Sequence, residues 1–142
     1  MAEGLFRKCV ETKDCFQVKS AGIAAATGST ASIETRNILL EHDVDFTSFR
    51  SQQLNNELMD VADYVFCMSK HHRQAILSHN PSYREKTLLV GEFLGEETAV
   101  DVFDPFGLGE PAYKDVEKQL VVAVKNIASF IEDNSSLQQD LK

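Results

Sequence analysis

The chain has 142 residues, of which 43% are hydrophobic and 25% are charged. This length suits one domain that buries a sizeable core, and the composition is ordinary for a globular protein. The formal net charge of −8 and the pI of about 4.9 argue against nucleic acid or an anionic membrane surface as the main partner.

The cysteine content gives no sign of a disulfide framework or a metal centre. Cys9, Cys15 and Cys67 are an odd number, form no CxxC pair and match no zinc spacing with the four histidines. We therefore expect no metal and no cofactor, and reduced thiols suit a reducing compartment. No apolar run has the length to span a bilayer, and residues 1–8 lack a signal-peptide core. A cytoplasmic location is expected.

The first half of the chain predicts helices separated by one short strand. Apolar residues at helical spacing predict an amphipathic helix from residue 1 to about residue 14, with Glu3 away from the apolar face. Alternation over residues 16–20 predicts a strand, and the Gly-, Ala-, Ser- and Thr-rich residues 22–32 predict a loop. Two further helices are expected, one capped by Ser32 that ends near 43 and one capped by Asn55 or Asn56 that ends near 62.

The second half of the chain predicts two buried strands. Residues 63–68 and 87–90 are continuous apolar runs, which is typical of strands covered on both faces. Ser69 is placed to cap a helix over residues 70–79 between them. A long amphipathic helix is expected from residue 112 to about residue 133, followed by a polar tail at 135–142.

Strands that alternate with helices predict an α/β fold with an open parallel sheet flanked by helices, in one domain over residues 1–134. Sites in such sheets lie beyond the carboxyl ends of the strands. The loops that follow Ser20 and Met68 and the loop that carries Asp104 are therefore expected to converge.

The sequence Asp101-Val-Phe-Asp-Pro-Phe-Gly107 holds the one credible catalytic acid. Pro105 fixes its own backbone and restricts Asp104, so this carboxylate sits on a stiff turn beside Phe103 and Phe106. A carboxyl group held in this way suits general acid catalysis. When these residues are taken alone, an ordinary Asp-Pro turn is the favoured interpretation.

No credible nucleophile accompanies this acid. Cys67 lies within a predicted buried strand, Cys9 lies on an apolar helix face, and nothing near Cys15 would lower its pKa. The histidines are expected at the surface, because no third ligand completes a metal set.

Five motifs in order resemble the low-molecular-weight protein tyrosine phosphatase family, including its bacterial arginine-phosphatase branch. They are Met1–Lys8, Ser20-Ala21-Gly22, Ala62–Met68, Leu89–Phe93 and Asp104-Pro105-Phe106-Gly107. The resemblance spans almost the whole chain, and Tyr113-Lys114 after Asp-Pro-Phe is nearest to the arginine-phosphatase branch.

The resemblance implies a three-layer α/β/α fold and roles for three residues. Asp104 would protonate the leaving group and then activate water to release a cysteinyl phosphate. Phe106 would form part of the wall that selects the substrate, which would be a phosphorylated protein. Ser20 would hydrogen-bond to the loop that holds the phosphate.

Two departures from the family pattern stand out. The family nucleophile lies in a Cys-five residues-Arg-Ser loop directly before the first helix, and that loop and the strand before it are absent from this sequence. In addition, Phe49 and Gln52 replace the family's usual histidine and arginine, so hydrogen bonds made by those residues are expected to be lost.

Two hypotheses account for the absent loop. In one, the natural protein begins about fifteen residues earlier, the length of a strand and its loop, and is an active phosphatase. In the other, the chain is a catalytically inactive relic that acts as a binding or regulatory protein. An arsenate reductase of the same fold would need redox cysteines after the strand at 63–68, and residues 69–92 contain none.

Overall fold

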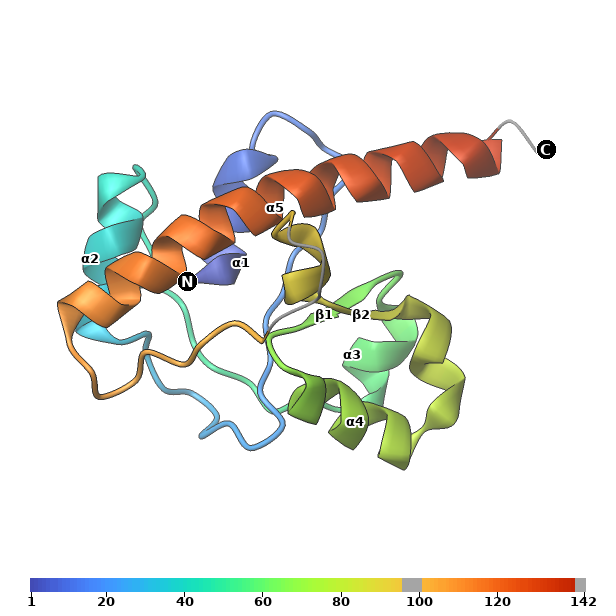
Figure 1. Cartoon of the computed structure of the whole chain (residues 1–142), viewed down its shortest axis with the longest axis horizontal. Coiled ribbons are helices and arrows are strands. Elements are labelled where there is room, and N and C mark those ends of the chain that lie inside the picture. The colour runs from blue at the N-terminus through green and yellow to red at the C-terminus, as the bar shows by residue number, and fades with distance from the viewer. Residues whose placement is uncertain (96–100, 140–142) are drawn as a thin grey trace.

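The structure, a computed structural model, describes residues 1–95 and 101–139 of the 142-residue chain. Figure 1 shows the long helix α5 crossing α1 and α2, with the two strands, α3 and α4 lying below it. The elements in chain order are α1 (Ala2–Cys9), α2 (Ile33–Glu41), α3 (Asn56–Val61), β1 (Val65–Cys67), α4 (Lys70–His79), the 3-10 helix η1 (Pro81–Lys86), β2 (Thr87–Leu89), the 3-10 helix η2 (Val90–Phe93) and α5 (Glu110–Gln139).

The predicted α/β fold with a parallel sheet is confirmed. Strands β1 and β2 pair in parallel, with Val65 opposite Thr87 and Cys67 opposite Leu89. Each strand is shorter than its predicted run at 63–68 or 87–90. Helix α4 connects β1 to β2, as a parallel pair requires a crossover.

The strand predicted at residues 16–20 is wrong. This segment has no strand pairing, and the nearby Gly22 forms only an isolated parallel bridge with Gln53. Side chains satisfy its backbone groups instead: a guanidinium nitrogen of Arg7 donates to the Val18 carbonyl at 3.2 Å. A strand exists only where a neighbour pairs with it, and alternation in one segment does not supply that neighbour.

Two predicted helix ends also differ from the structure. Helix α1 stops at Cys9 rather than near residue 14, and Thr12 and Asp14 follow, two residue types that compete poorly for helix interiors. Helix α5 continues past residue 133 to Gln139, so much of the predicted polar tail at 135–142 is helical. Residues 140–142 lie outside the described part of the chain, as do residues 96–100 of the loop that carries Asp104.

The predicted helix N-caps are confirmed. The side chains of Ser32, Asn55 and Ser69 accept hydrogen bonds from the third backbone N–H of α2, α3 and α4 respectively. These short polar side chains satisfy donors that the helix itself leaves free. The start of each of these helices is therefore fixed by local sequence.

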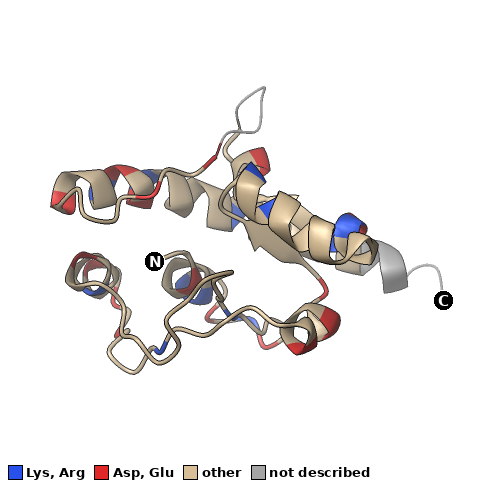
Figure 2. Cartoon of the chain, turned by 90° about the horizontal axis from the view of Figure 1, so that it is seen from below, with Lys and Arg blue, Asp and Glu red and all other residues tan. Residues whose placement is uncertain are grey.

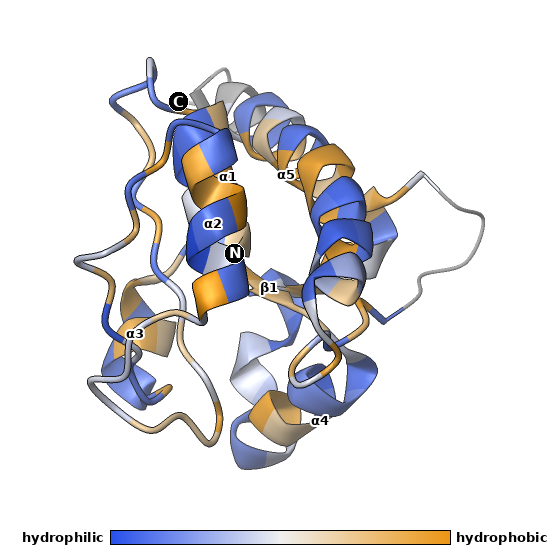
Figure 3. Ribbon diagram, turned by 90° about the vertical axis from the view of Figure 1, so that its left-hand side faces the viewer, coloured by the Kyte–Doolittle hydropathy of each residue, from blue (hydrophilic) through white to orange (hydrophobic). Residues whose placement is uncertain are grey.

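Two apolar clusters hold the fold together. Helices α1 and α2 pack on α5, and Figure 3 shows hydrophobic positions in orange on α1 and α5. Leu39 of α2 and Ala123 of α5 are fully buried in this larger cluster. The smaller cluster surrounds the sheet and consists of Met59, Cys67, Ile76, Tyr83 and Leu89.

Charged residues are spread over several helices in Figure 2, where both Lys or Arg positions and Asp or Glu positions are seen. Within residues 1–95 and 101–139, no helix is both long enough and apolar enough to cross a bilayer.

An ion-paired cluster joins α2 to α5. The Nε2 atom of His42 lies 2.6 Å from Oε1 of Glu117, and Lys114 Nζ lies 3.2 Å from the other carboxylate oxygen. Burial opposes ionisation of Glu117, but the hydrogen bonds from His42 and Lys114 outweigh it and hold its pKa below the usual value. A depressed carboxyl pKa stabilises the fold above the unfolded-state pKa, and this stabilisation is lost as the pH falls through the folded-state pKa.

Substitution of Glu117 by Gln is therefore expected to lower the free energy of unfolding by about 1 kcal/mol near neutral pH. The difference from the unsubstituted chain should be smaller at about pH 3, because the stabilisation from the Glu117 carboxylate is lost as the pH falls. Urea unfolding followed by circular dichroism at the two pH values measures it. Glu85→Gln, at an exposed position of η1, is the control, and an equal loss in both variants would contradict the assignment.

Candidate active site

The loop that carries Asp104 is anchored at the carboxyl end of β1. The backbone N–H of Val102 donates to the carbonyl of Met68 at 2.8 Å, directly after the strand. The carboxylate of Asp101 accepts a hydrogen bond of 2.8 Å from the backbone N–H of Lys70, the first residue of α4. A carboxylate is favourable at this position because the first turn of a helix has free N–H groups and a partial positive charge. Two of the three loops expected to converge are thus joined.

Asp104 itself lies on an exposed turn. Its Oδ1 atom accepts a hydrogen bond of 3.1 Å from the backbone N–H of Phe106, and Leu108 N–H donates to the Pro105 carbonyl at 3.0 Å. Gly107 has a φ of +79°, a conformation in which a side chain would be strained. These constraints fix the turn and leave the second carboxylate oxygen open to a ligand.

Aromatic rings flank this carboxylate on the surface. Phe106 is 79% exposed and Phe103 is 58% exposed, although both are large apolar side chains. Val102, directly before Phe103, is buried and holds the loop to the core. Exposed rings beside an exposed acid provide an apolar surface for the organic part of a substrate.

Ser20 contacts the start of α1. Its backbone N–H donates to the Glu3 carboxylate at 2.8 Å, and its hydroxyl donates to the same oxygen. The other carboxylate oxygen of Glu3 lies 2.5 Å from a guanidinium nitrogen of Arg7. Glu3 is only 8% exposed, so its predicted place away from the buried face of the helix is wrong. Its burial follows from three donors, and the two from Ser20 lie outside the helix, where the local helical pattern does not reveal them.

The segment at residues 49–52 keeps hydrogen bonding to this region despite its departures from the family. The Gln52 side-chain amide donates to the Ser20 carbonyl at 2.9 Å. Phe49 makes an apolar contact instead, stacked on Phe46 with ring centres 4.7 Å apart. Hydrogen bonds to α1 and to residues 49–52 therefore both fix the position of Ser20.

In Figure 1 the orange segment that leads into α5, which carries Asp104, passes below the N-terminal end of α1. Within the described residues no hydrogen bond or ion pair links Ser20 directly to residues 101–107. No group of three or more His, Cys, Asp or Glu side chains in this part of the chain is arranged to hold a metal ion.

The sequence contains one cysteine–arginine pair at the spacing of the family's nucleophile loop. Five residues separate Cys67 from Arg73, as in the family's nucleophile loop, although Gln74 follows in place of serine. Cys67 is the last residue of β1 and is 5% exposed, and Arg73 lies inside α4 with its Nε bonded to the Thr87 carbonyl at 2.9 Å. Only two residues separate the strand from the helix, so no phosphate-holding loop forms there.

The chemistry of Cys67 agrees with this geometry. Burial raises the pKa of its thiol to about 11, against a smaller opposite effect of Arg73. A thiol with that pKa is about 0.1% ionised at pH 8. Cys67 is thus an inert core thiol, as its position in an apolar run predicted.

Thiol labelling tests this directly. At about pH 8 a disulfide reagent such as Ellman's reagent is expected to label Cys15, which is exposed, at least about a hundredfold faster than Cys67. Cys67 should react only after unfolding in guanidinium chloride. A Cys15→Ser variant isolates the slower reactions, and rapid labelling of Cys67 in the folded variant would refute the assignment.

Comparison with known proteins identifies the family. A family model described as low molecular weight phosphotyrosine protein phosphatase matches residues 1–141. The chain belongs to this family. The protein-arginine-phosphatase of Geobacillus stearothermophilus is 32% identical to it over 116 residues, which are 82% of this chain and 77% of that protein.

Solved structures of both phosphatase branches share the fold. The low molecular weight protein tyrosine phosphatase from T. tengcongensis is 31% identical, with a TM-score of 0.82 over 90% of this chain and 87% of that chain. A cysteine-to-serine mutant of the YwlE arginine phosphatase, with a phosphorylated active-site serine, is 30% identical. Its TM-score is 0.84 over 92% of this chain and 86% of that chain. This low molecular weight phosphatase fold is therefore common to arginine- and tyrosine-phosphatase relatives.

Proposed function

We propose that this protein hydrolyses phosphorylated tyrosine or arginine side chains of proteins, with Asp104 as the general acid and base. The observation that carries the proposal is the anchored, exposed Asp104 turn at the carboxyl end of β1, within a family of phosphatases. Phe106 forms the apolar wall beside the phosphorylated side chain, and its exposure leaves it free to do so.

The reaction has two steps and needs a cysteine thiolate. The thiolate attacks phosphorus, the bond from phosphorus to the side-chain oxygen or nitrogen breaks, and Asp104 gives its proton to that leaving atom. Asp104, now ionised, takes a proton from water as the water oxygen attacks phosphorus. Phosphate leaves, and the thiolate is restored. The phosphorylated serine in the cysteine-to-serine mutant of the YwlE arginine phosphatase supports a covalent intermediate in that relative.

The nucleophile in this proposal belongs to a Cys-five residues-Arg-Ser loop encoded before Met1. Such a loop would end at the start of α1, where free backbone N–H groups and the helix dipole favour a phosphate group. Ser20 and Glu3 would then lie next to that loop, and the hydrogen bonds between them would fix the start of α1. The free cysteines suit the reducing cytoplasm that we propose as its location.

A second function is favoured by one observation. The only cysteine–arginine pair with the family's spacing is the inert Cys67–Arg73 pair in β1 and α4. A chain of these 142 residues alone would then bind phosphorylated proteins without hydrolysing them, as an inactive relic.

Sequencing and assay of the upstream frame separate the two functions. The DNA before the Met1 codon is expected to encode the loop in frame, and the longer product should release phosphate from phosphotyrosine and phosphoarginine peptides. The 142-residue chain should show no turnover with p-nitrophenyl phosphate. A stop codon before any such loop would overturn the catalytic proposal and leave the relic, and the ratio of kcat/KM for the two peptides assigns the substrate.

A further inference from the structure

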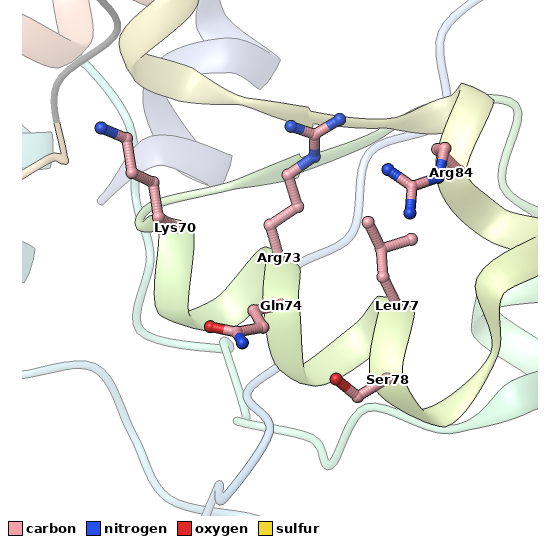
Figure 4. Close-up of a pocket in the computed structure, with 6 residues that line it drawn as sticks. All are labelled: Lys70, Arg73, Gln74, Leu77, Ser78 and Arg84. Atoms are coloured by element: carbon pink, nitrogen blue, oxygen red, sulfur yellow. The ribbon is translucent and has the colours of Figure 1, made fainter.

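Helix α4 and the 3-10 helix η1 line an open surface pocket of about 430 Å³ that none of the steps above uses. Its size is within the range of sites for small molecules. The side chains that line it are shown in Figure 4 and are Lys70, Arg73, Gln74, Leu77, Ser78 and Arg84.

The lining of this pocket is strongly cationic. Among the residues that the structure describes, the lining contributes three positive charges and no carboxylate, in a chain whose formal net charge is −8. Within residues 1–95 and 101–139, neither Lys70, Arg73 nor Arg84 forms an ion pair, whereas Arg7, Lys8 and several other cations do. Three cations gathered around one pocket repel each other unless an anion lies among them.

The two guanidinium groups are arranged to share such an anion. Arg73 donates its Nε–H to the carbonyl of Thr87 at 2.9 Å, which fixes the side chain against β2 and leaves its two terminal nitrogens available. In Figure 4 the Arg84 guanidinium extends over Leu77 toward the Arg73 side of the pocket. The Arg84 side chain is exposed, and within the described residues its guanidinium forms no hydrogen bond or ion pair.

The chemistry of these donors selects among anions. A guanidinium presents a planar fork of N–H groups that matches two oxygens of a carboxylate or a phosphate. One guanidinium group occupies both oxygens of a carboxylate with hydrogen bonds. A phosphoryl group has three oxygens and accepts hydrogen bonds from two guanidinium groups at once. The neighbouring Leu77 gives an apolar surface for the rest of the ligand, and Gln74 and Ser78 add polar groups.

We propose that the pocket between α4 and η1 is a second anion site that binds a phosphoryl group, separate from the hydrolytic site at Asp104. The phosphoryl group belongs either to a small phosphorylated molecule or to a phosphorylated side chain of a protein. Lys70 lies at the edge of the pocket nearest to the Asp104 loop, because its backbone N–H binds Asp101.

Calorimetric titration of the 142-residue chain at constant ionic strength tests the site without any turnover. The probes are inorganic pyrophosphate, a phosphoserine peptide and the same peptide without phosphate. Arg84→Gln is expected to weaken binding of the phosphorylated probes about tenfold, the loss of one charge-assisted contact. Lys125→Gln, at an exposed position of α5, removes the same charge elsewhere and should leave binding unchanged.

Arg73→Gln is the second variant and should weaken binding at least as much, with circular dichroism to confirm that it folds. Tighter binding of the phosphopeptide than of pyrophosphate assigns the ligand to a protein, and the reverse order assigns it to a small molecule. The proposal is overturned if neither phosphorylated probe binds, if the unphosphorylated peptide binds equally well, or if Lys125→Gln and Arg84→Gln have equal effects.

Discussion

Replacing Asp104 with Asn in the catalytically complete protein is expected to lower kcat for phosphotyrosine hydrolysis by about 10²- to 10⁴-fold. The amide cannot donate a proton to the leaving oxygen, and the turn itself should persist. Its amide oxygen still accepts from the Phe106 N–H, and the loop stays anchored through Val102 and Asp101. The loss therefore reports proton transfer rather than a displaced loop.

The dependence on the leaving group distinguishes this role from a structural one. Protonation matters most when the leaving oxygen is strongly basic, so the loss should grow across a series of aryl phosphates as the pKa of the phenol rises. Steady-state kinetics with such a series measure it, from p-nitrophenyl phosphate to phosphotyrosine. A uniform loss across the series would contradict general acid catalysis by Asp104.

Asp101→Asn is the matched control in the same loop. Its carboxylate accepts from the first N–H of α4, so its neutral amide should cost about 1 kcal/mol of stability through weaker capping. The dependence of kcat on the leaving group should stay as it was. The two aspartates, three residues apart, would then separate positioning of the loop from chemistry.

Features that depend on a few neighbouring residues could be predicted from the sequence. Ser32, Asn55 and Ser69 cap their helices because an N-cap bonds to an N–H only three residues ahead. The rigid turn at Asp104 follows in the same way from Pro105. The parallel β1–β2 pair was also predictable, because apolar strands joined by a helix have few other arrangements.

Features that depend on distant partners could not be predicted. The segment at 16–20 alternates like a strand, yet its backbone groups bond to Arg7, Glu3 and Gln52 rather than to a neighbouring strand. The burial of Glu3 likewise depends on Ser20, seventeen residues later. The sequence pattern contains one signal that sequence reasoning did not use: Glu3 and Arg7 are four residues apart on one helix, which places them as an ion pair.

Glu3 is the residue whose loss should most disturb the packing of α1 on the Ser20 segment. Glu3→Ala is expected to lower the free energy of unfolding by about 2–3 kcal/mol, because the Ser20 N–H and hydroxyl lose their acceptor in a largely buried place. Glu3→Gln keeps an acceptor oxygen and should cost about 1 kcal/mol. Urea unfolding followed by circular dichroism measures both.

Two comparisons show whether the contact to Ser20 causes this loss. Glu11→Ala removes another glutamate near the end of α1, one that is exposed and pairs only with Lys8, so it should cost at most about 0.5 kcal/mol. In a double-mutant cycle, Glu3→Ala and Ser20→Ala should couple by about 1 kcal/mol. If the Glu3 and Glu11 variants lost equal stability, or if the cycle showed no coupling, Glu3 would not be the link that joins α1 to Ser20. With the link confirmed, the start of α1 is fixed where the proposed phosphate-holding loop would meet it.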